Sequence, residues 1–444
     1  MKIQLSDHFT YSKLLRFTIP SIVMMIFTSI YGVVDGIFVS NFVGKTPFAA
    51  INFIMPFLMV FSAIGFMIGT GGSALVSMTI GEGDRTRANR MFSLLIYANI
   101  VFGIAFSVLG LIFLRPVARL LGAEGEMLEY CVEYGRIILP ALTFFMLQNT
   151  FQSFLITAEK PKLGLGVTIA AGCTNIVLDA LFVAVFRWGL AGAAVATAIS
   201  QLVGGVVPLI YFAMPNSSLL RLTGCSFDGR ARALIKTFTN GSSELMTNVS
   251  MSLVNMLYNF QLMRFIGEDG VAVYGVIMYV NFIFIGVFVG YSIGSAPIIG
   301  YNYGAQNYAE LQNMYRKSLR LIAVLAASLT LLAELLALPL AKIFVSYDAE
   351  LLSLTRHAFM LYALAFLVMG FNIFGSSFFT ALNNGLVSAA ISFLRTLLFQ
   401  LASVLLLPMI LGLDGIWLSI LMAELMSLAV TIYCFIRMRP TYHY

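Results

Sequence analysis

Charged residues are scarce in this sequence of 444 residues. Asp, Glu, Lys and Arg make up 10% of the chain, whereas soluble domains carry about 25%. Hydrophobic residues make up 60%. A water-soluble main body is therefore excluded, and a membrane protein is indicated.

Residues that form disulfides or bind metals are also few. The four cysteines and three histidines are scattered, without the spacing of zinc ligands or of a disulfide framework. We expect packing roles for the cysteines and no metal ligand among the histidines: Cys131, Cys173, Cys225, Cys434, His8, His357 and His443.

A nucleotide-binding motif is missing as well. The glycine-rich segment Gly69–Gly72 lacks the Gly-Lys-Ser/Thr ending of a phosphate loop and follows no strand. We interpret it as a place of close helix packing. The sequence therefore predicts a protein that is not an enzyme, needs no cofactor and takes its energy from an ion gradient.

About twelve apolar stretches are long enough to cross a bilayer, which takes about 20 residues in helix. The first, Phe17–Val39, is too long for a signal peptide and has no cleavage site, so we expect it to remain as a helix. The twelve predicted helices are 14–40, 47–80, 91–114, 127–157, 163–186, 190–213, 234–265, 271–301, 313–338, 353–381, 385–410 and 413–436.

The chain repeats itself with a shift of 223 positions. Gly81, Thr157-Ala158, Gly189 and Gly192 recur without a gap as Gly304, Thr380-Ala381, Gly412 and Gly415. Such a duplication predicts an all-α membrane protein with two six-helix bundles, related by a pseudo-two-fold axis along the membrane normal. We place the bundles at 1–214 and 233–444, with a cytoplasmic linker at 215–232 and a substrate path in a cleft between them.

The positions of Lys and Arg predict the orientation, because these residues are retained on the cytoplasmic side. One set of helix ends carries about twice as many as the other. We therefore predict that both termini are cytoplasmic in a multi-pass protein of the cytoplasmic (inner) membrane, and that the net charge of +6 reflects topology and not nucleic-acid binding. The cytoplasmic set is Lys13, Arg16, Arg85, Arg87, Arg90, Lys160, Lys162, Arg221, Arg230, Arg232, Lys236, Arg316, Lys317, Arg320, Arg437 and Arg439, and the opposite set includes Lys45, Arg115, Arg119, Arg187 and Lys342.

Short motifs, taken together in their order and spacing, give the chain a resemblance to a known family. They are Pro20 with Tyr31-Gly-Val-Val-Asp35-Gly-Ile-Phe, Ala49-Ala-Ile-Asn52 with Pro56, Gly81-Glu-Gly-Asp84, Ala158-Glu-Lys-Pro161, Asn175-Ile-Val-Leu-Asp179 and Gly189-Leu-Ala-Gly192-Ala-Ala. Over essentially its whole length the sequence resembles the multidrug and toxic compound extrusion (MATE) family, in its prokaryotic DinF-like branch. The resemblance implies a transporter that couples export to ion entry.

Acids inside a bilayer are expensive, which makes them candidates for function. Asp35 and Asp179 are the two acids well inside the apolar stretches of the first half, and Asn175 lies on the same helical face as Asp179. With Tyr134 and Thr197 they fall in one layer. Two nearby buried acids resist joint ionisation, and their oxygens suit H⁺ or Na⁺.

The resemblance assigns the coupling site to these five residues, of which Asp35, Asn175, Asp179 and Thr197 are candidate Na⁺ ligands. It also makes Pro20 the bend point of the first helix. Asn and Thr inside helices also serve as simple packing contacts, so a structural role stays open for them.

The second half does not repeat this site, since Asp35, Asn175 and Asp179 map onto Tyr258, Leu398 and Ala402. It carries Glu244, Arg395, Glu334 and Glu424 instead. We expect a polar pair between Glu244 and Arg395, and a role of these two residues in substrate binding stays open. In some relatives an acid on the helix at 353–381 helps to bind Na⁺, but this chain has Asn372 there.

Methionine and aromatic side chains offer an adaptable, cation-tolerant lining. Candidates near the middle of helices that border the cleft are Met55, Met59, Met67, Met278, Phe282 and Phe288. We therefore predict a monomeric antiporter, driven by H⁺ or Na⁺, that exports lipophilic and often cationic small molecules and binds no nucleic acid. A lipid-linked precursor flippase of the same superfamily is the alternative, although it needs a strongly cationic cleft.

Overall fold

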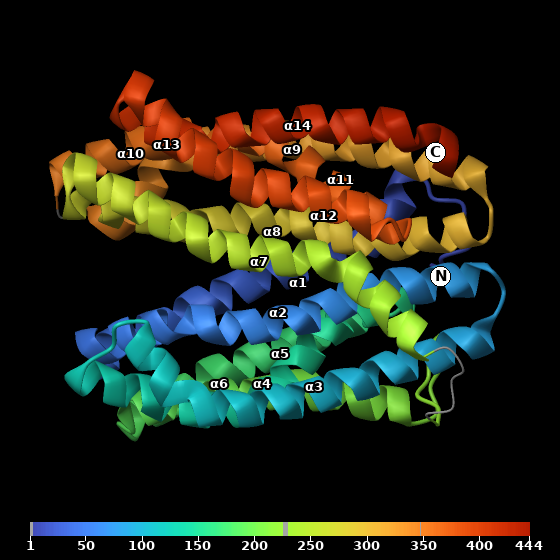
Figure 1. The fold of residues 1–444 in the computed structure, drawn as a ribbon, viewed down its shortest axis with the longest axis horizontal. Coiled ribbons are helices and arrows are strands. Elements are labelled where there is room, and N and C mark those ends of the chain that lie inside the picture. The colour runs from blue at the N-terminus through green and yellow to red at the C-terminus, as the bar shows by residue number, and fades with distance from the viewer. Residues whose placement is uncertain (1–2, 225–229, 347) are drawn as a thin grey trace.

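The protein folds into two helical bundles that lie side by side along their length (Figure 1). The structure is a computed structural model that describes residues 3–224, 230–346 and 348–444. The N-terminal bundle consists of α1 (Tyr11–Phe38), α2 (Lys45–Gly81), α3 (Arg85–Leu120), α4 (Gly125–Thr157), α5 (Pro161–Asp179) and α6 (Gly189–Ala213). The π-helical segments η1 (Val39–Val43) and η2 (Ala180–Val185) extend α1 and α5.

The C-terminal bundle starts with α7 (Arg230–Ile266), α8 (Glu268–Gly304) and α9 (Tyr308–Val345). It continues with α10 (Ala349–Ala363), α11 (Phe366–Ala381), α12 (Gly385–Phe393), the π-helical η3 (Leu394–Leu398), α13 (Phe399–Leu411) and α14 (Leu413–Tyr442). α10 with α11 forms one bent span, and α12 with η3 and α13 forms another span. With α7, α8, α9 and α14, the described part of this bundle is arranged as six long helical segments.

The helix boundaries confirm the duplication. α2 and α8 begin at Lys45 and Glu268 and end at Gly81 and Gly304, and the shift is 223 at both ends. The turns that follow are built alike, because Asp84 accepts a hydrogen bond from the first turn of α3 and Asn307 does the same for α9. The Gly81–Asp84 motif is thus a helix stop followed by an N-cap.

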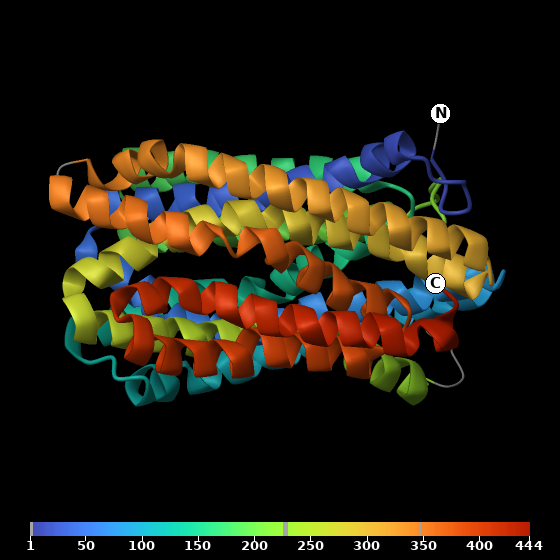
Figure 2. The same cartoon turned by 90° about the horizontal axis from the view of Figure 1, so that it is seen from above.

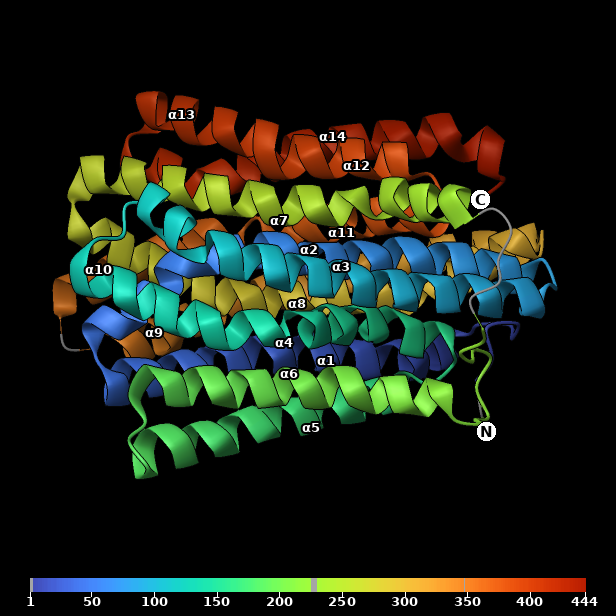
Figure 3. The ribbon, with the colours of Figure 1, turned by 60° about the horizontal axis from the view of Figure 1, so that its bottom comes forward.

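The two bundles touch through reciprocal contacts, as a two-fold axis requires. A Cβ on Gly81 would collide with the Tyr301 carbonyl, and one on Gly304 would collide with the Met78 carbonyl, which is the same pair shifted by 223. Further along, α2 lies against α7 and α1 against α8 (Figure 3). Glycine at these crossings lets the backbones of the two bundles approach closely.

Both termini lie at the same end of the bundles (Figures 1 and 2). The helix ends with the larger set of basic residues lie there too, since α1 starts at this end and α14 finishes at it. We call it the terminal end. The side chains of Lys45 and Arg230 lie outside the described residues, as does Cys225.

Two spans differ from the expected single apolar helices. The helix predicted at 353–381 is broken between Ala363 and Phe366 with a bend of 47°. Neither proline nor glycine marks the break, so the sequence carries no local signal for it. α7 is less apolar than the other spans because it turns Glu244, Thr247 and Asn248 toward a cavity.

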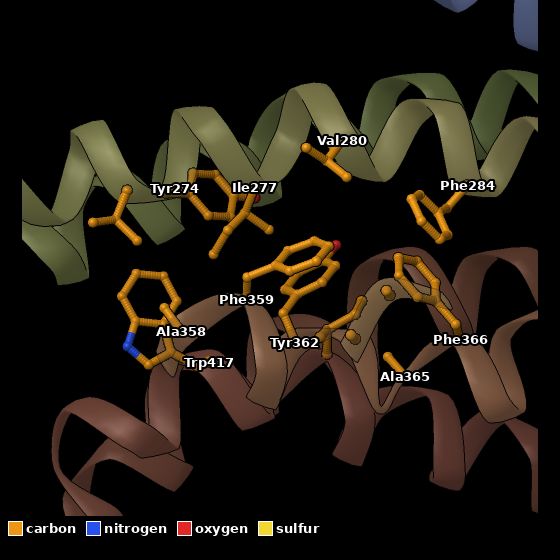
Figure 4. Close-up of a cluster of buried hydrophobic side chains, with 14 of the residues drawn as sticks. Tyr274, Ile277, Val280, Phe284, Ala358, Phe359, Tyr362, Ala365, Phe366 and Trp417 are labelled. Atoms are coloured by element: carbon orange, nitrogen blue, oxygen red, sulfur yellow. The ribbon is translucent and has the colours of Figure 1, made fainter. Parts of the chain in front are cut away.

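Large aromatic side chains fill the core of the C-terminal bundle beside this break. Phe284 of α8 stacks on Phe366 with ring centroids 5.1 Å apart, and Tyr362 packs edge-on against Phe366 (Figure 4). Trp417 of α14 is fully buried in the same cluster. The packing of α8 on both α10 and α11 therefore holds the bent span in place.

The segment before α1 crosses the terminal end and contacts both bundles. Its residues Leu5 and Phe9 are fully buried. The Leu5 N–H donates to Glu159 of the N-terminal bundle at 2.8 Å, and the Phe9 N–H donates to Glu310 of α9 at 2.9 Å. We call residues 3–10 the N-terminal strap.

The segment that follows α6 in the sequence, residues 214–224, packs on α3. Arg85 donates to the carbonyls of Ser218 and Leu219, and Asn89 accepts from the Arg221 N–H. Of the predicted linker at 215–232, residues 225–229 lie outside the described residues, and α7 already begins at Arg230. The division into 1–214, 215–232 and 233–444 stays a prediction.

Candidate functional site

Five polar residues predicted from the sequence meet inside the N-terminal bundle. Asp35 is on α1, Tyr134 on α4, Asn175 and Asp179 on α5, and Thr197 on α6. Asp179, Tyr134 and Asn175 are almost completely buried, with exposed fractions of 0%, 1% and 2%. We call these five residues the carboxylate cluster.

Electrostatic interactions and one hydrogen bond link the four helices that carry the carboxylate cluster. Asp35 and Asp179 lie within hydrogen-bonding reach of each other, and Tyr134 interacts with both carboxyl groups and with Thr197. Asn175 Nδ2 donates to Thr197 Oγ1 at 3.4 Å. Asp179 is the last residue of α5, directly before η2, and π-helical turns often occur at functional sites.

The cluster has more acceptors than donors. Both carboxylate oxygens of Asp179, Oδ1 of Asp35 and Oδ1 of Asn175 are buried and receive no N–H or O–H donor from the described residues. A hydrogen bond between the two carboxyl groups requires a proton on one of them. Unpaired acceptors in a low-dielectric site are costly, so this arrangement fits a bound proton or a hard cation such as Na⁺.

Sequence reasoning missed two neighbours of this cluster. Tyr31 lies near Asp35, and Gln148 of α4 lies near the Tyr31 hydroxyl. Tyr31 precedes Asp35 by four residues, so helical spacing could have identified it. Gln148 had no such signal, because nothing in the sequence shows that its side chain lies near Tyr31.

A second polar site lies in the C-terminal bundle, where a cavity of about 320 Å³ is lined mainly by α7, α8 and α10–α14. Met25 of α1, Ser153 of α4, and Phe66, Thr70 and Ser73 of α2 also line it. Its charged lining residues are Glu244, Arg395 and Glu424. We call it the C-bundle cavity.

Arg395 pairs with a different acid from the one expected. Its Nε donates to Glu424 Oε1 at 2.8 Å and Oε2 at 3.1 Å. Glu244 is close enough to interact electrostatically with Arg395, but among the residues that the structure describes it forms no ion pair within 4.0 Å. The expected Glu244–Arg395 pair is therefore wrong as a direct contact, because α14 brings Glu424 closer to η3 than α7 brings Glu244.

The polar residue on α11 belongs to the same network. Asn372 Nδ2 donates to Glu424 Oε2 at 2.7 Å, and Asn372 Oδ1 accepts from Thr431 at 2.9 Å. Asn372 thus stabilises the buried acid of α14.

The predicted apolar lining is only partly at the cavity. Met278 and Phe282 line it. The other four do not line it. Phe288 is buried in the core, and Met67 is 7% exposed where α2 crosses α7. Met55 packs in the N-terminal bundle, and the Met59 sulfur accepts a hydrogen bond from Ser62 at 3.7 Å. Pro20 is buried within α1, which runs as one helix from Tyr11 to Phe38, so its role as a bend point stays a prediction.

Comparison with known proteins gives consistent results. The family model described as MatE matches residues 20–181 and 245–405, one copy in each half. "Multidrug export protein MepA" of Staphylococcus saprophyticus is 23% identical over 421 residues, covering 93% of this chain and 91% of that protein. The protein of the same name in Staphylococcus haemolyticus is 26% identical over 323 residues, covering 71% and 70%.

Solved structures are similar over nearly the whole chain. An outward-facing multidrug resistance MATE transporter has a TM-score of 0.91 at 23% identity, covering 96% of this chain and 95% of that one. A crystal structure of MATE in the straight conformation has a TM-score of 0.91 at 21% identity, covering 96% of both chains. These likenesses establish the fold with twelve transmembrane helices in two bundles.

Proposed function

The chain belongs to the MatE family, and we propose that it exports lipophilic, often cationic, small molecules in exchange for H⁺ or Na⁺ that bind at the carboxylate cluster. As a family member it is a multi-pass membrane transporter and not an enzyme. The proposed exchange needs no cofactor and one copy of the chain.

The observation that carries the coupling proposal is the surplus of buried acceptor oxygens around Asp35 and Asp179. A proton or Na⁺ entering this cluster removes the repulsion between the two carboxylates and satisfies their oxygens. The ion-loaded and ion-free bundles therefore differ in free energy, which a coupling site requires.

The C-bundle cavity is our proposed substrate site. Its volume of about 320 Å³ is at the lower end of the range for small-molecule pockets. Because Arg395 and Glu424 neutralise each other, an ionised Glu244 gives the lining a net negative charge. Such a lining favours an organic cation, and Met278 and Phe282 supply apolar and aromatic surface.

α1 links the two sites. Met25 lines the C-bundle cavity and Asp35 belongs to the carboxylate cluster, ten residues or about 15 Å further along the same helix. We propose that ion binding at Asp35 and Asp179 moves α1 against the cavity and so lowers its affinity for substrate. Reciprocal linkage then makes substrate binding expel the ion.

We place the protein in the cytoplasmic membrane, with the terminal end on the cytoplasmic side. Most of the basic residues lie at this end, as expected for cytoplasmic loops. In this orientation the reciprocal contacts of Gly81 and Gly304 seal the cytoplasmic entrance. The flippase alternative is less favoured, because a pyrophosphate needs a cleft with several cationic groups and Arg395 is the single cation among the described lining residues.

The test is flux of rhodamine 123, a fluorescent cation, from proteoliposomes under a pH gradient, a Na⁺ gradient or neither. We expect efflux under at least one gradient and none without. Efflux driven by ATP with neither gradient present would exclude ion-coupled transport.

A further inference from the structure

We propose that Arg395 forms an anion subsite in the C-bundle cavity, so that the cavity binds zwitterions, with their carboxylate on Arg395 and their cationic group toward Glu244. This inference depends on the proposed function, since it takes the C-bundle cavity as the substrate site. It adds a second point of recognition that a simple cation does not use.

Arg395 has donors left over after pairing with Glu424. In the described part of the chain its guanidinium donates through Nε alone, although it carries four further N–H groups on its two Nη atoms. The side chain of Glu424 is 0% exposed, whereas that of Arg395 is 12% exposed and lines the cavity. The free Nη pair forms the planar fork that recognises a carboxylate with two parallel hydrogen bonds.

The network behind Arg395 keeps this fork in position. Glu424 is held by Asn372, which Thr431 holds in turn. Arg395 itself lies in the π-helical η3, where the helix widens. A guanidinium that is held in place before binding loses less entropy on binding than a mobile one. One guanidinium can also bridge two carboxylates, because Nε and the Nη pair lie on different edges of the planar group.

The rest of the cavity suits a polar ligand with two charged ends. Three lining residues have a buried polar atom that finds no partner among the described residues: Tyr258 Oη, Asn281 Oδ1 and Ser292 Oγ. Together with Glu244, these atoms provide acceptors and hydroxyls on α7 and α8, while the donors of Arg395 come from η3. The cavity wall therefore offers groups for both a cationic and an anionic part of one ligand.

A matched pair of dyes tests the subsite. Rhodamine 110 carries a free carboxylate and is a zwitterion at neutral pH, and rhodamine 123 is its methyl ester and a cation. Fluorescence anisotropy of the purified full-length protein gives both affinities. We expect Arg395→Lys, which keeps the charge beside Glu424 but loses the fork, to weaken rhodamine 110 binding about tenfold or more. The ratio of rhodamine 110 affinity to rhodamine 123 affinity should fall about tenfold, because only the free carboxylate of rhodamine 110 loses hydrogen bonds.

A second variant guards against misfolding. Arg395→Gln/Glu424→Gln removes both charges of the pair, so that no buried charge is left alone, and it should show the same selective loss. Glu244→Gln should weaken both dyes. If Arg395→Lys leaves rhodamine 110 affinity unchanged, or weakens both dyes equally, the subsite is refuted while the proposed function stands. If the wild type binds neither dye, the proposed function fails and the subsite fails with it.

Discussion

Closure of the terminal end depends on backbone contact at Gly304. A Cβ added to this residue would lie 2.8 Å from the carbonyl carbon of Met78 and 3.0 Å from its Cα. These are backbone atoms, which cannot move aside by changing a rotamer, so Gly304→Ala must push α2 and α8 apart. Overpacking of this kind costs about 1–3 kcal/mol, which shifts the balance between closed and separated bundles about 5- to 150-fold.

The assay is the distance between spin labels at Thr86 on α3 and Arg316 on α9, both exposed near the terminal end. Double electron–electron resonance should show a longer distance in Gly304→Ala than in the unsubstituted labelled protein. Gly275→Ala is the matched control, because it lies on the same helix and its Cβ would meet nothing within 4 Å. If both alanine variants give the same distance distribution, glycine contact does not control closure.

Three further predictions concern topology and stability. Single cysteines that replace Gly83 and Asn384 should be protected from an impermeant thiol reagent in intact cells, because α2 ends and α12 begins at the terminal end. A cysteine that replaces Glu268 should be labelled, because α8 begins at the opposite end. The reverse labelling pattern would mean that the terminal end faces outward. Arg395→Ala should destabilise the protein by about 3–5 kcal/mol because it leaves Glu424 buried and unpaired, and thermal unfolding that matches the wild type would contradict the ion pair's importance. Glu310→Ala removes the carboxylate that accepts hydrogen bonds from the Phe9 N–H and from His8. Proteolysis within the N-terminal strap should therefore become faster. An unchanged cleavage rate would show that the strap does not depend on Glu310.

Regular features of the fold could be predicted from the sequence because they repeat. The 223-residue shift locates equivalent helix ends at Gly81 and Gly304, and apolar length locates the spans. The break between Ala363 and Phe366 could not be predicted, because it depends on how aromatic residues of α8 pack against both segments and not on a local signal.

The candidate sites show the same limit. Asp35 and Asp179 stood out because acids are rare in apolar helices, and the structure brings them together. The partner of Arg395 could not be chosen from the sequence, since both Glu244 and Glu424 lie on helices of the same bundle. Glu424 is the partner because α14 packs beside η3, which brings its carboxylate to Arg395.

The central claim is that Asp35 and Asp179 couple transport to an ion gradient. Replacing each by asparagine keeps the shape of the side chain and removes its ionisable group. Glu334→Gln is the control, because it also removes an acid from an apolar helix but lies outside the carboxylate cluster.

The decisive measurement is rhodamine 123 efflux from proteoliposomes that contain Asp35→Asn/Asp179→Asn, under a pH or a Na⁺ gradient. We predict no gradient-driven efflux from this variant, with rhodamine 123 binding retained, and near wild-type efflux from Glu334→Gln. Efflux at the wild-type rate from the double variant would contradict the account and leave the two acids with a structural role only.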